Sequence, residues 1–285
     1  MRAILSLFKT GRDIPETDRI FWELSAHLAR KFHGPTKLYA DPESARTLID
    51  KWGITFDELD VTTIPKDTRG CHPMCWSAGK LAAMRAEAAQ GKPFFHIDGD
   101  AFLLSPLRED LRSSRMFCQC IEKQLKRRRN VYRKNSHYPL NELLPDLKMP
   151  RFMQKYFSLP LQRVMNMGIF GGTDCASIHE YADIAIKVFV QNRYNTQAFT
   201  RFHRSRPHFL GIAAISEQWS ASAYCHWKGI IPTQLMNRID AFNLNRMHEV
   251  QFGHIYSAVR KLRNYQHWAS RKLESLLAQP QLAAA

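Results

Sequence analysis

Residues 94–104 decide the fold, and they read Phe-Phe-His-Ile-Asp-Gly-Asp-Ala-Phe-Leu-Leu. The first four residues form a mostly apolar run that is short enough to be a buried strand. Two aspartates, Asp98 and Asp100, then flank a single glycine. Carboxylate oxygens bind hard divalent cations, and such a cation can neutralise a bound diphosphate. The stretch therefore predicts a metal and nucleotide site directly after a strand.

A plain turn is the alternative interpretation of Asp-Gly-Asp, because glycine supplies positive φ and aspartate bonds its own backbone. A hairpin turn should be flanked by alternating strands. Here apolar residues lie on both sides of the aspartates, namely Phe94, Phe95, Ile97, Phe102, Leu103 and Leu104. We therefore expect the two carboxylates to lie beside the hydrophobic core, which favours a site over a simple turn.

Strands and helices alternate along the first part of the chain. Apolar runs predict strands over 3–8, 36–39, 58–64 and 94–97. Helical periodicity predicts a helix over 20–32, a second in the segment that follows Pro42 and ends at Trp52, and a third over 76–89. In the third helix, Trp76, Lys80 and Met84 share one face. This series is typical of a mostly parallel sheet with helices on both faces.

Ligands of such sheets bind beyond the carboxyl ends of the strands, which is where Asp98 and Asp100 lie. The residues that end or follow the earlier strands could line the same rim and contact a base or ribose. They are Tyr39, Asp41, Thr10 and Arg12. Ordinary solvation of loop residues is the alternative for these four.

Four separated segments resemble the metal-dependent glycosyltransferases of the GT-A fold, and especially a poorly characterised group of bacterial glycosyltransferases. The segments are Trp76–Lys80, the DxD motif within His96–Asp100, Asn166–Gly172, and Glu217–Gln218 followed by Gly253–Tyr256. The resemblance implies one α/β domain over 1–275 with a GT-A-like, Rossmann-like, mostly parallel sheet flanked by helices. Its donor half would span about 1–110 and its acceptor half about 111–275, with a disordered tail at 276–285.

The resemblance also implies an activity. A hexosyltransferase of this kind moves a sugar from a nucleoside-diphosphate sugar, with UDP favoured, to a glycan, lipid-linked or other acceptor. Asp98 and Asp100 would hold Mn²⁺ or Mg²⁺ on the diphosphate, so that Asp100 takes part in catalysis through the metal. His254 would be a further ligand, and because imidazole suits manganese better than magnesium, Mn²⁺ is favoured.

Glu217 is the predicted catalytic side chain on the acceptor side. In an inverting transfer it would act as general base toward the attacking hydroxyl, and in a retaining enzyme it would have another role, such as orienting the donor sugar. A helix-terminal glutamate or a structural salt bridge is the alternative.

Five further residues are predicted to bind the donor. Lys80 could reach a phosphate or pair with an aspartate, although a lone lysine on a helix is often a solvated charge. Asn166 would offer its amide to sugar hydroxyls, and Gly168 would allow close approach of the ligand, although glycines at a strand end often mark a turn. Arg260 and Lys261 would share the charge of the diphosphate.

The chain is strongly basic, with 41 lysines and arginines against 26 acids and a formal charge of +15. Basic residues concentrate at 123–134 and 246–272. These stretches are either solvated faces or contacts for an anionic acceptor or an anionic membrane surface.

A basic nucleic-acid-binding protein and a metal-dependent nuclease or phosphotransferase are the rival classes. No helix-turn-helix, zinc-finger or aromatic RNA-binding signature supports the first, so no specific nucleic acid is expected as a partner. The second lacks a Walker loop and the further acids that a two-metal site usually needs.

Six cysteines and the absence of an export signal or a long apolar stretch predict a cytoplasmic enzyme with reduced thiols, with peripheral contact at the inner face of the membrane as an option. Cys71, His72, Cys75, Cys118 and Cys120 could be grouped as a zinc site, but their spacing does not match structural zinc sites.

Overall fold

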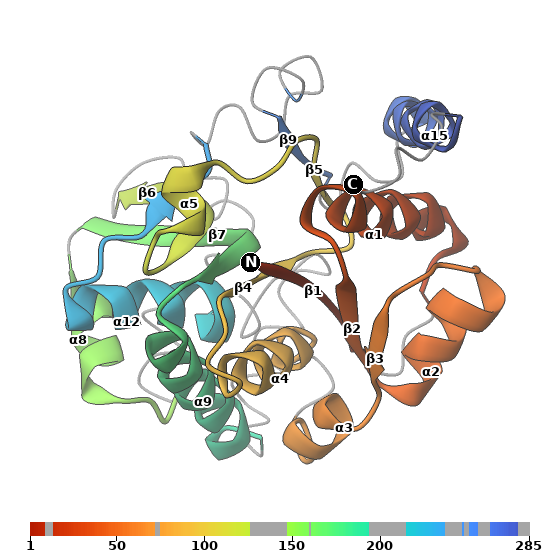
Figure 1. Cartoon of the computed structure of the whole chain (residues 1–285). Coiled ribbons are helices and arrows are strands. Elements are labelled where there is room, and N and C mark those ends of the chain that lie inside the picture. The colour runs from red at the N-terminus through yellow and green to blue at the C-terminus, as the bar shows by residue number, and fades with distance from the viewer. Residues whose placement is uncertain are drawn as a thin grey trace.

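The structure is a computed structural model that describes residues 1–8, 14–71, 75–125, 147–159, 161–193, 215–236, 247, 251–255 and 263–278. A seven-stranded sheet forms its centre, with the strand order β3-β2-β1-β4-β7-β6-β8 (Figure 1). A separate two-stranded sheet pairs β5 with β9. The strands are β1 (Arg2–Leu7), β2 (Thr36–Ala40), β3 (Glu58–Asp60), β4 (Phe94–Ile97), β5 (Ala101–Leu103), β6 (Phe117–Leu125), β7 (Leu161–Gly172), β8 (Thr233–Gln234) and β9 (Phe252–His254).

Helices and helical turns connect these strands. The helices are α1 (Arg19–His33), α2 (Pro42–Ala45), α3 (Thr63–Asp67), α4 (Ser77–Ala88), α5 (Glu109–Arg112), α8 (Arg151–Ser158), α9 (Cys175–Gln191), α12 (Ser220–Lys228) and α15 (Arg263–Leu277). A 3₁₀ turn, η1 (Glu16–Asp18), precedes α1, and π-helical turns occur at η2 (Arg46–Lys51) and η4 (Ile215–Trp219). Within the described part of the chain, none of these helices combines the length and the apolar character that a membrane span requires.

The sheet is mainly parallel. Strands β1, β2, β3 and β4 run in one direction, β7 is antiparallel to both β4 and β6, and β8 is parallel to β6. Helices cover both faces, as the alternation of strands and helices predicts. The predicted class, a single α/β domain with a mostly parallel sheet flanked by helices, is confirmed.

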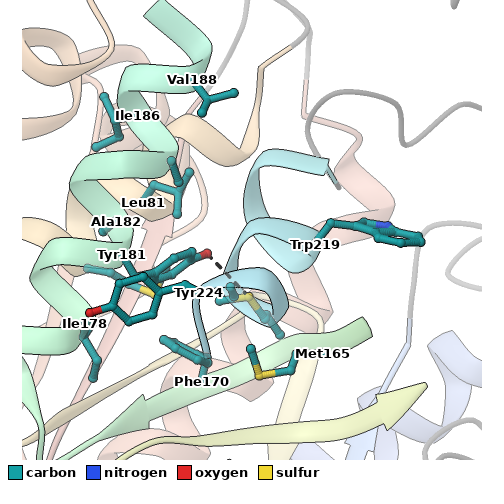
Figure 2. Close-up of a cluster of buried hydrophobic side chains, with 14 of the residues drawn as sticks. Leu81, Met165, Phe170, Ile178, Tyr181, Ala182, Ile186, Val188, Trp219 and Tyr224 are labelled. Carbon is teal, nitrogen blue, oxygen red and sulfur yellow. Dashed lines mark hydrogen bonds between the residues drawn. The ribbon is translucent and has the colours of Figure 1, made fainter. Parts of the chain in front are cut away.

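Alternate residues of the strands feed two different cores, as the two-residue period of a strand requires. Ile4 and Phe94 pack with α4, α9 and α12, whereas Leu5 and Phe95 pack on the opposite face, which α1 covers. Figure 2 shows the first core, where side chains of α9 and α12 meet those of β7. Phe170 of β7 and Tyr181 of α9 make an edge contact there, with their ring centroids 5.8 Å apart.

Helix α4 packs against α9 and against strands β1 and β4, and it is buried along most of its length. Small residues make this possible: a Cβ added at Gly79 would lie 2.4 Å from the Cβ of Phe8. Helix α4 begins at Ser77, one residue later than predicted. Trp76 at its N-cap is 40% exposed, whereas Lys80 and Met84, which were predicted to share its face, are buried.

The third predicted strand, 58–64, is too long. Strand β3 ends at Asp60, whose side chain accepts hydrogen bonds of 2.9 Å from the backbone N–H groups of Thr62 and Thr63. These bonds turn the chain into α3, so Ile64 lies in a helix.

The predicted rim residues are also corrected in part. Tyr39 is buried, and its hydroxyl donates to Oε2 of Glu87 at 2.7 Å, so it does not line the rim. Asp41 caps α2 by accepting from the N–H groups of Glu43 and Ser44. Thr10 and Arg12 lie outside the described residues.

Candidate metal centre

The Asp98-Gly99-Asp100 turn follows β4 in the middle of the sheet, and helix α1 holds it in place. The hydroxyl of Ser25 donates to the Asp98 carbonyl at 3.1 Å, and the Ala101 N–H donates to the same carbonyl at 3.0 Å. The ring of Trp22 covers Gly99 so closely that an added Cβ would lie 2.2 Å from it. Only glycine fits here, and the turn therefore fixes the backbone positions of both aspartates.

The small β5–β9 sheet brings His254 to the two aspartates. Ala101 pairs with His254 in this sheet, and the N–H of Ile255 donates to the Asp100 carbonyl at 2.8 Å. One ligand atom each from Asp98, Asp100 and His254 can be chosen so that all lie within 4.8 Å of one another. Among the described residues this is the one group of at least three side chains suited to hold a metal ion.

Gln119 sets the orientation of the His254 ring. Its Oε1 lies 2.8 Å from His254 Nδ1, and because an amide oxygen only accepts, Nδ1 carries the proton in this pairing. In the neutral ring Nε2 then keeps its lone pair, and this nitrogen lies 3.4 Å from Oδ1 of Asp100. Such outer partners fix the tautomer of metal-binding histidines. The sequence analysis missed Gln119, which lies at a bulge between Cys118 and Cys120 of β6, where strand alternation fails.

Gly168 of β7 makes room for this arrangement. Its carbonyl accepts from the Asp98 N–H at 2.9 Å, and an added Cβ would lie 2.3 Å from Gln119 Oε1 and 2.5 Å from His254 Nδ1. The side chain of Asn166 is buried, and its Oδ1 accepts from the Gly168 N–H at 3.1 Å. Gly168 thus lies directly beside the His254 ring, and Asn166 supports the backbone of Gly168 within β7.

We expect Gly168→Ala to weaken metal binding at least about tenfold, because the new methyl group displaces His254 and Gln119, and loss of such support typically costs that much. Overpacking should also lower the free energy of unfolding by about 1–3 kcal/mol. Titration with Mn²⁺ and urea unfolding measure the two effects.

Gly171→Ala is the matched control for that variant. A Cβ there would meet the backbone of Phe94, at 2.3 Å from its carbonyl oxygen, and neither Gln119 nor His254 is among its near contacts. It should lose stability and, where folded, keep its Mn²⁺ affinity. A folded Gly168→Ala variant with unchanged affinity would contradict the role given to this glycine.

Lys80 is buried beside Asp98 rather than solvated. Its side chain is 5% exposed, and Nζ lies 2.8 Å from both Asp98 Oδ1 and Glu217 Oε1. It also donates to the carbonyl of Met167. The three N–H donors of the ammonium group are therefore all satisfied. Of the two roles predicted for Lys80, the geometry shows the pairing with an aspartate.

Glu217 reaches this cluster from η4. Its side chain is only 2% exposed, and Oε2 has no hydrogen-bond partner among the described residues. The hydroxyl of Tyr181 on α9 donates to its backbone carbonyl at 2.8 Å. The structure thus brings Glu217 to Lys80, beneath the more exposed carboxylate of Asp98.

Neighbouring carboxylates favour the charged forms of Lys80 and His254. Burial lowers the pKa of Lys80, but the adjacent carboxylates Asp98 and Glu217 outweigh burial and raise it, so the ammonium stays charged. Burial also lowers the pKa of His254, and the Asp100 carboxylate reverses this and raises it. His96 behaves differently, because burial and the charge of Lys80 place its pKa well below the ordinary value and keep it neutral.

Residues 8–280 match a family model described as a family of unknown function, DUF6734. The chain belongs to DUF6734. No curated protein matches its sequence. Solved structures similar to this DUF6734 member include the crystal structure of mouse xyloside xylosyltransferase 1 in its apo form. That structure is 12% identical, the match covers 90% of this chain and 98% of that chain, and the TM-score is 0.44.

Several predicted contacts of the DUF6734 chain lie outside the described residues. They include Arg260 and Lys261, predicted to bind the diphosphate, and most of the basic stretch 123–134. His72, which was considered as a ligand of a zinc site, also lies outside the described residues. Among the described residues, Cys71, Cys75, Cys118 and Cys120 belong to no group of three or more potential metal ligands, and none of the four forms a disulfide.

Proposed function

We propose that this protein is a metal-dependent glycosyltransferase that moves a sugar from a nucleoside-diphosphate sugar to an acceptor. The convergence of Asp98, Asp100 and His254 at the carboxyl end of β4 carries the proposal. Ligands of open α/β sheets bind at such strand ends, and a divalent cation beside two carboxylates is suited to a diphosphate.

The side chains at this centre fit a divalent cation. Two carboxylates and one imidazole suit Mn²⁺, with Mg²⁺ as the alternative, and Gln119 already fixes the His254 tautomer that leaves Nε2 for a metal. Bound there, the metal would offset negative charge on the nucleoside diphosphate as the glycosidic bond breaks.

The remaining residues have supporting roles in this proposal. Asp98 and Asp100 would hold the metal while Lys80 fixes Asp98 from below. Asn166 and Gly168 would form the floor on which the donor sugar lies, and Arg260 and Lys261 would contact the diphosphate. The general-base role of Glu217 is less well supported, because its carboxylate is buried and occupied by Lys80.

The finer assignments stay predictions. UDP is the favoured nucleotide and a hexose the favoured sugar, and the acceptor would be a glycan, a lipid-linked or another anionic molecule. Contact with an anionic membrane through 123–134 and 246–272 at the inner face of a cell membrane agrees with the formal charge of +15.

Calorimetric titration of UDP and GDP, with and without Mn²⁺, tests the proposed function. We expect binding of one nucleotide that requires the metal. Failure of folded protein to bind either nucleotide would overturn the proposal. Metal-independent, salt-sensitive binding of DNA or RNA would then point to a nucleic-acid-binding protein, and strand cleavage to a nuclease.

Metal binding should strengthen as the pH rises. In the metal-free protein the pKa of His254 is raised by Asp100, despite burial, and a protonated Nε2 cannot bind a metal. Below that raised pKa, Mn²⁺ must displace a proton, so its affinity should fall as the pH decreases from about 8 to about 6. Calorimetry in two buffers with different ionisation enthalpies measures the proton release, and an affinity independent of pH would contradict His254 as a ligand.

A further inference from the structure

A buried lysine lies between two carboxylates that differ in their access to solvent. Asp98 is 29% exposed and belongs to the metal centre, whereas Glu217 is 2% exposed. Lys80 Nζ is 2.8 Å from each. The three residues come from the turn after β4, from η4 and from α4, so the ammonium group connects elements from both halves of the chain.

Stability alone is a weak reason for such a pair. Burying an ammonium and a carboxylate costs desolvation energy, and well-packed apolar residues in place of a buried pair are often at least as stable. Lys80 has all three donors occupied, yet Glu217 uses only Oε1 on it, and Oε2 has no partner among the residues that the structure describes. A buried polar atom of this kind calls for an explanation.

Glu217 is anchored from its own side. The Tyr181 hydroxyl holds its backbone carbonyl, and Tyr181 packs against Tyr224 of α12 with ring centroids 6.1 Å apart. Figure 2 shows Tyr181 and Tyr224 in contact within the core, and Trp219 at the end of η4. Because α9 and α12 fix the backbone of Glu217, its carboxylate is held where Lys80 lies.

Lys80 in turn restricts the orientation of the Asp98 carboxylate. The ammonium donates to Oδ1, and this bond limits the rotation of a carboxylate that belongs to the candidate metal-binding group. Without the anchored Glu217, nothing described on the opposite side would hold Lys80 against Asp98 except the Met167 carbonyl.

We infer that Glu217 and Lys80 form a positioning pair, in which Glu217 acts through Lys80 to hold Asp98 in its metal-binding orientation. The inference rests on the proposed metal site and assigns Glu217 to support of the metal ligand instead of proton removal from the acceptor. The pair has no net charge, so replacing both residues together leaves the net charge of the site unchanged. Any effect of the replacement on metal affinity would therefore come from the orientation of Asp98.

The double variant Lys80→Met/Glu217→Leu tests this inference, with Mn²⁺ affinity as the readout in the absence of any sugar donor. We expect the urea midpoint to stay close to that of the wild type, since the ion pair is replaced by apolar groups. The Mn²⁺ affinity should fall about tenfold or more, as for other residues that orient a ligand. An affinity equal to that of the wild type in this folded variant would overturn the inference.

Two further variants sharpen the result. In an Asp98→Asn background the same double substitution should add little further loss, and a full additive loss would overturn the route through Asp98. Lys51→Met/Glu16→Leu removes an exposed pair, 3.0 Å apart, and should leave Mn²⁺ affinity unchanged. A tenfold loss there would also count against the inference, since the effect would then not be specific to the buried pair.

A polar double variant keeps the inference testable if the apolar double variant does not fold. Lys80→Gln/Glu217→Gln keeps the net charge and some hydrogen bonding, and should still lose about threefold in Mn²⁺ affinity. Wild-type Mn²⁺ affinity in this variant would overturn the positioning role of Lys80 and Glu217 but not the proposed function. If the wild-type protein itself binds no divalent metal, the proposed function fails. The two failures are therefore distinguishable.

Discussion

Asp100→Asn is expected to abolish metal-dependent nucleotide binding, with an affinity loss of at least about a hundredfold. The substitution removes one negative charge and one ligand oxygen while keeping the shape of the side chain. The backbone is spared, because the Asp100 carbonyl still accepts from the Ile255 N–H and β5 still pairs with β9. His254 would also lose the carboxylate that its Nε2 faces at 3.4 Å.

Calorimetry with Mn²⁺ and the better of UDP and GDP measures this loss. Asp110→Asn is the matched control, because Asp110 is an exposed aspartate that pairs with Arg108 on the surface. The control should bind as the wild type does. Metal-dependent binding that survives in a folded Asp100→Asn variant would remove Asp100 from the metal site and weaken the whole functional proposal.

Lys80→Met is expected to cost about 3–5 kcal/mol in the free energy of unfolding, the largest stability effect we anticipate. The variant leaves Glu217 buried without its partner, and Asp98 loses its hydrogen bond from Nζ. Burial already raises the pKa of Glu217, and removal of Lys80 would raise it further. A carboxyl with a raised folded-state pKa is most favourable at low pH, so the deficit should shrink as the pH falls.

Urea unfolding at about pH 8 and about pH 5 measures both parts of this prediction. Lys51→Met, at an exposed ion pair with Glu16, should cost only about 0–1 kcal/mol. Adding Glu217→Leu to Lys80→Met should recover most of the loss. A single Lys80→Met variant as stable as the control would mean that the buried pair is not maintained in solution.

Local patterns predicted the elements that lie near the centre of the sheet. The apolar runs of β1, β2 and β4, and the periodicity of α1, were visible because each buries its own regular face. The end of β3 was not visible, since it depends on hydrogen bonds that the Asp60 carboxylate accepts from the backbone of α3 and the turn before it. Nor could any local pattern show that β7 inserts antiparallel between β4 and β6, because strand order is set by contacts far apart in sequence.

The candidate site divides in the same way. Asp98 and Asp100 follow from a short motif, whereas His254 and Glu217 were indicated only by family resemblance. The burial of Lys80 could not be predicted, since a lysine on a helix is normally solvated and its partner Glu217 comes from a distant segment. The contact between Gln119 and His254 could not be predicted from the sequence, because Gln119 lies at a bulge in β6 where the regular alternation of side chains fails.

The β5–β9 sheet also limits when the site can exist. It joins the turn of Asp100 to His254, so a nascent chain that has emerged only as far as Asp100 carries the acidic residues without the imidazole. Lacking Gln119, Gly168 and Glu217 as well, such a chain cannot assemble the full centre. Synthesis must therefore pass His254 before the three proposed metal ligands can converge, so residues 1–110 alone cannot form the proposed metal site.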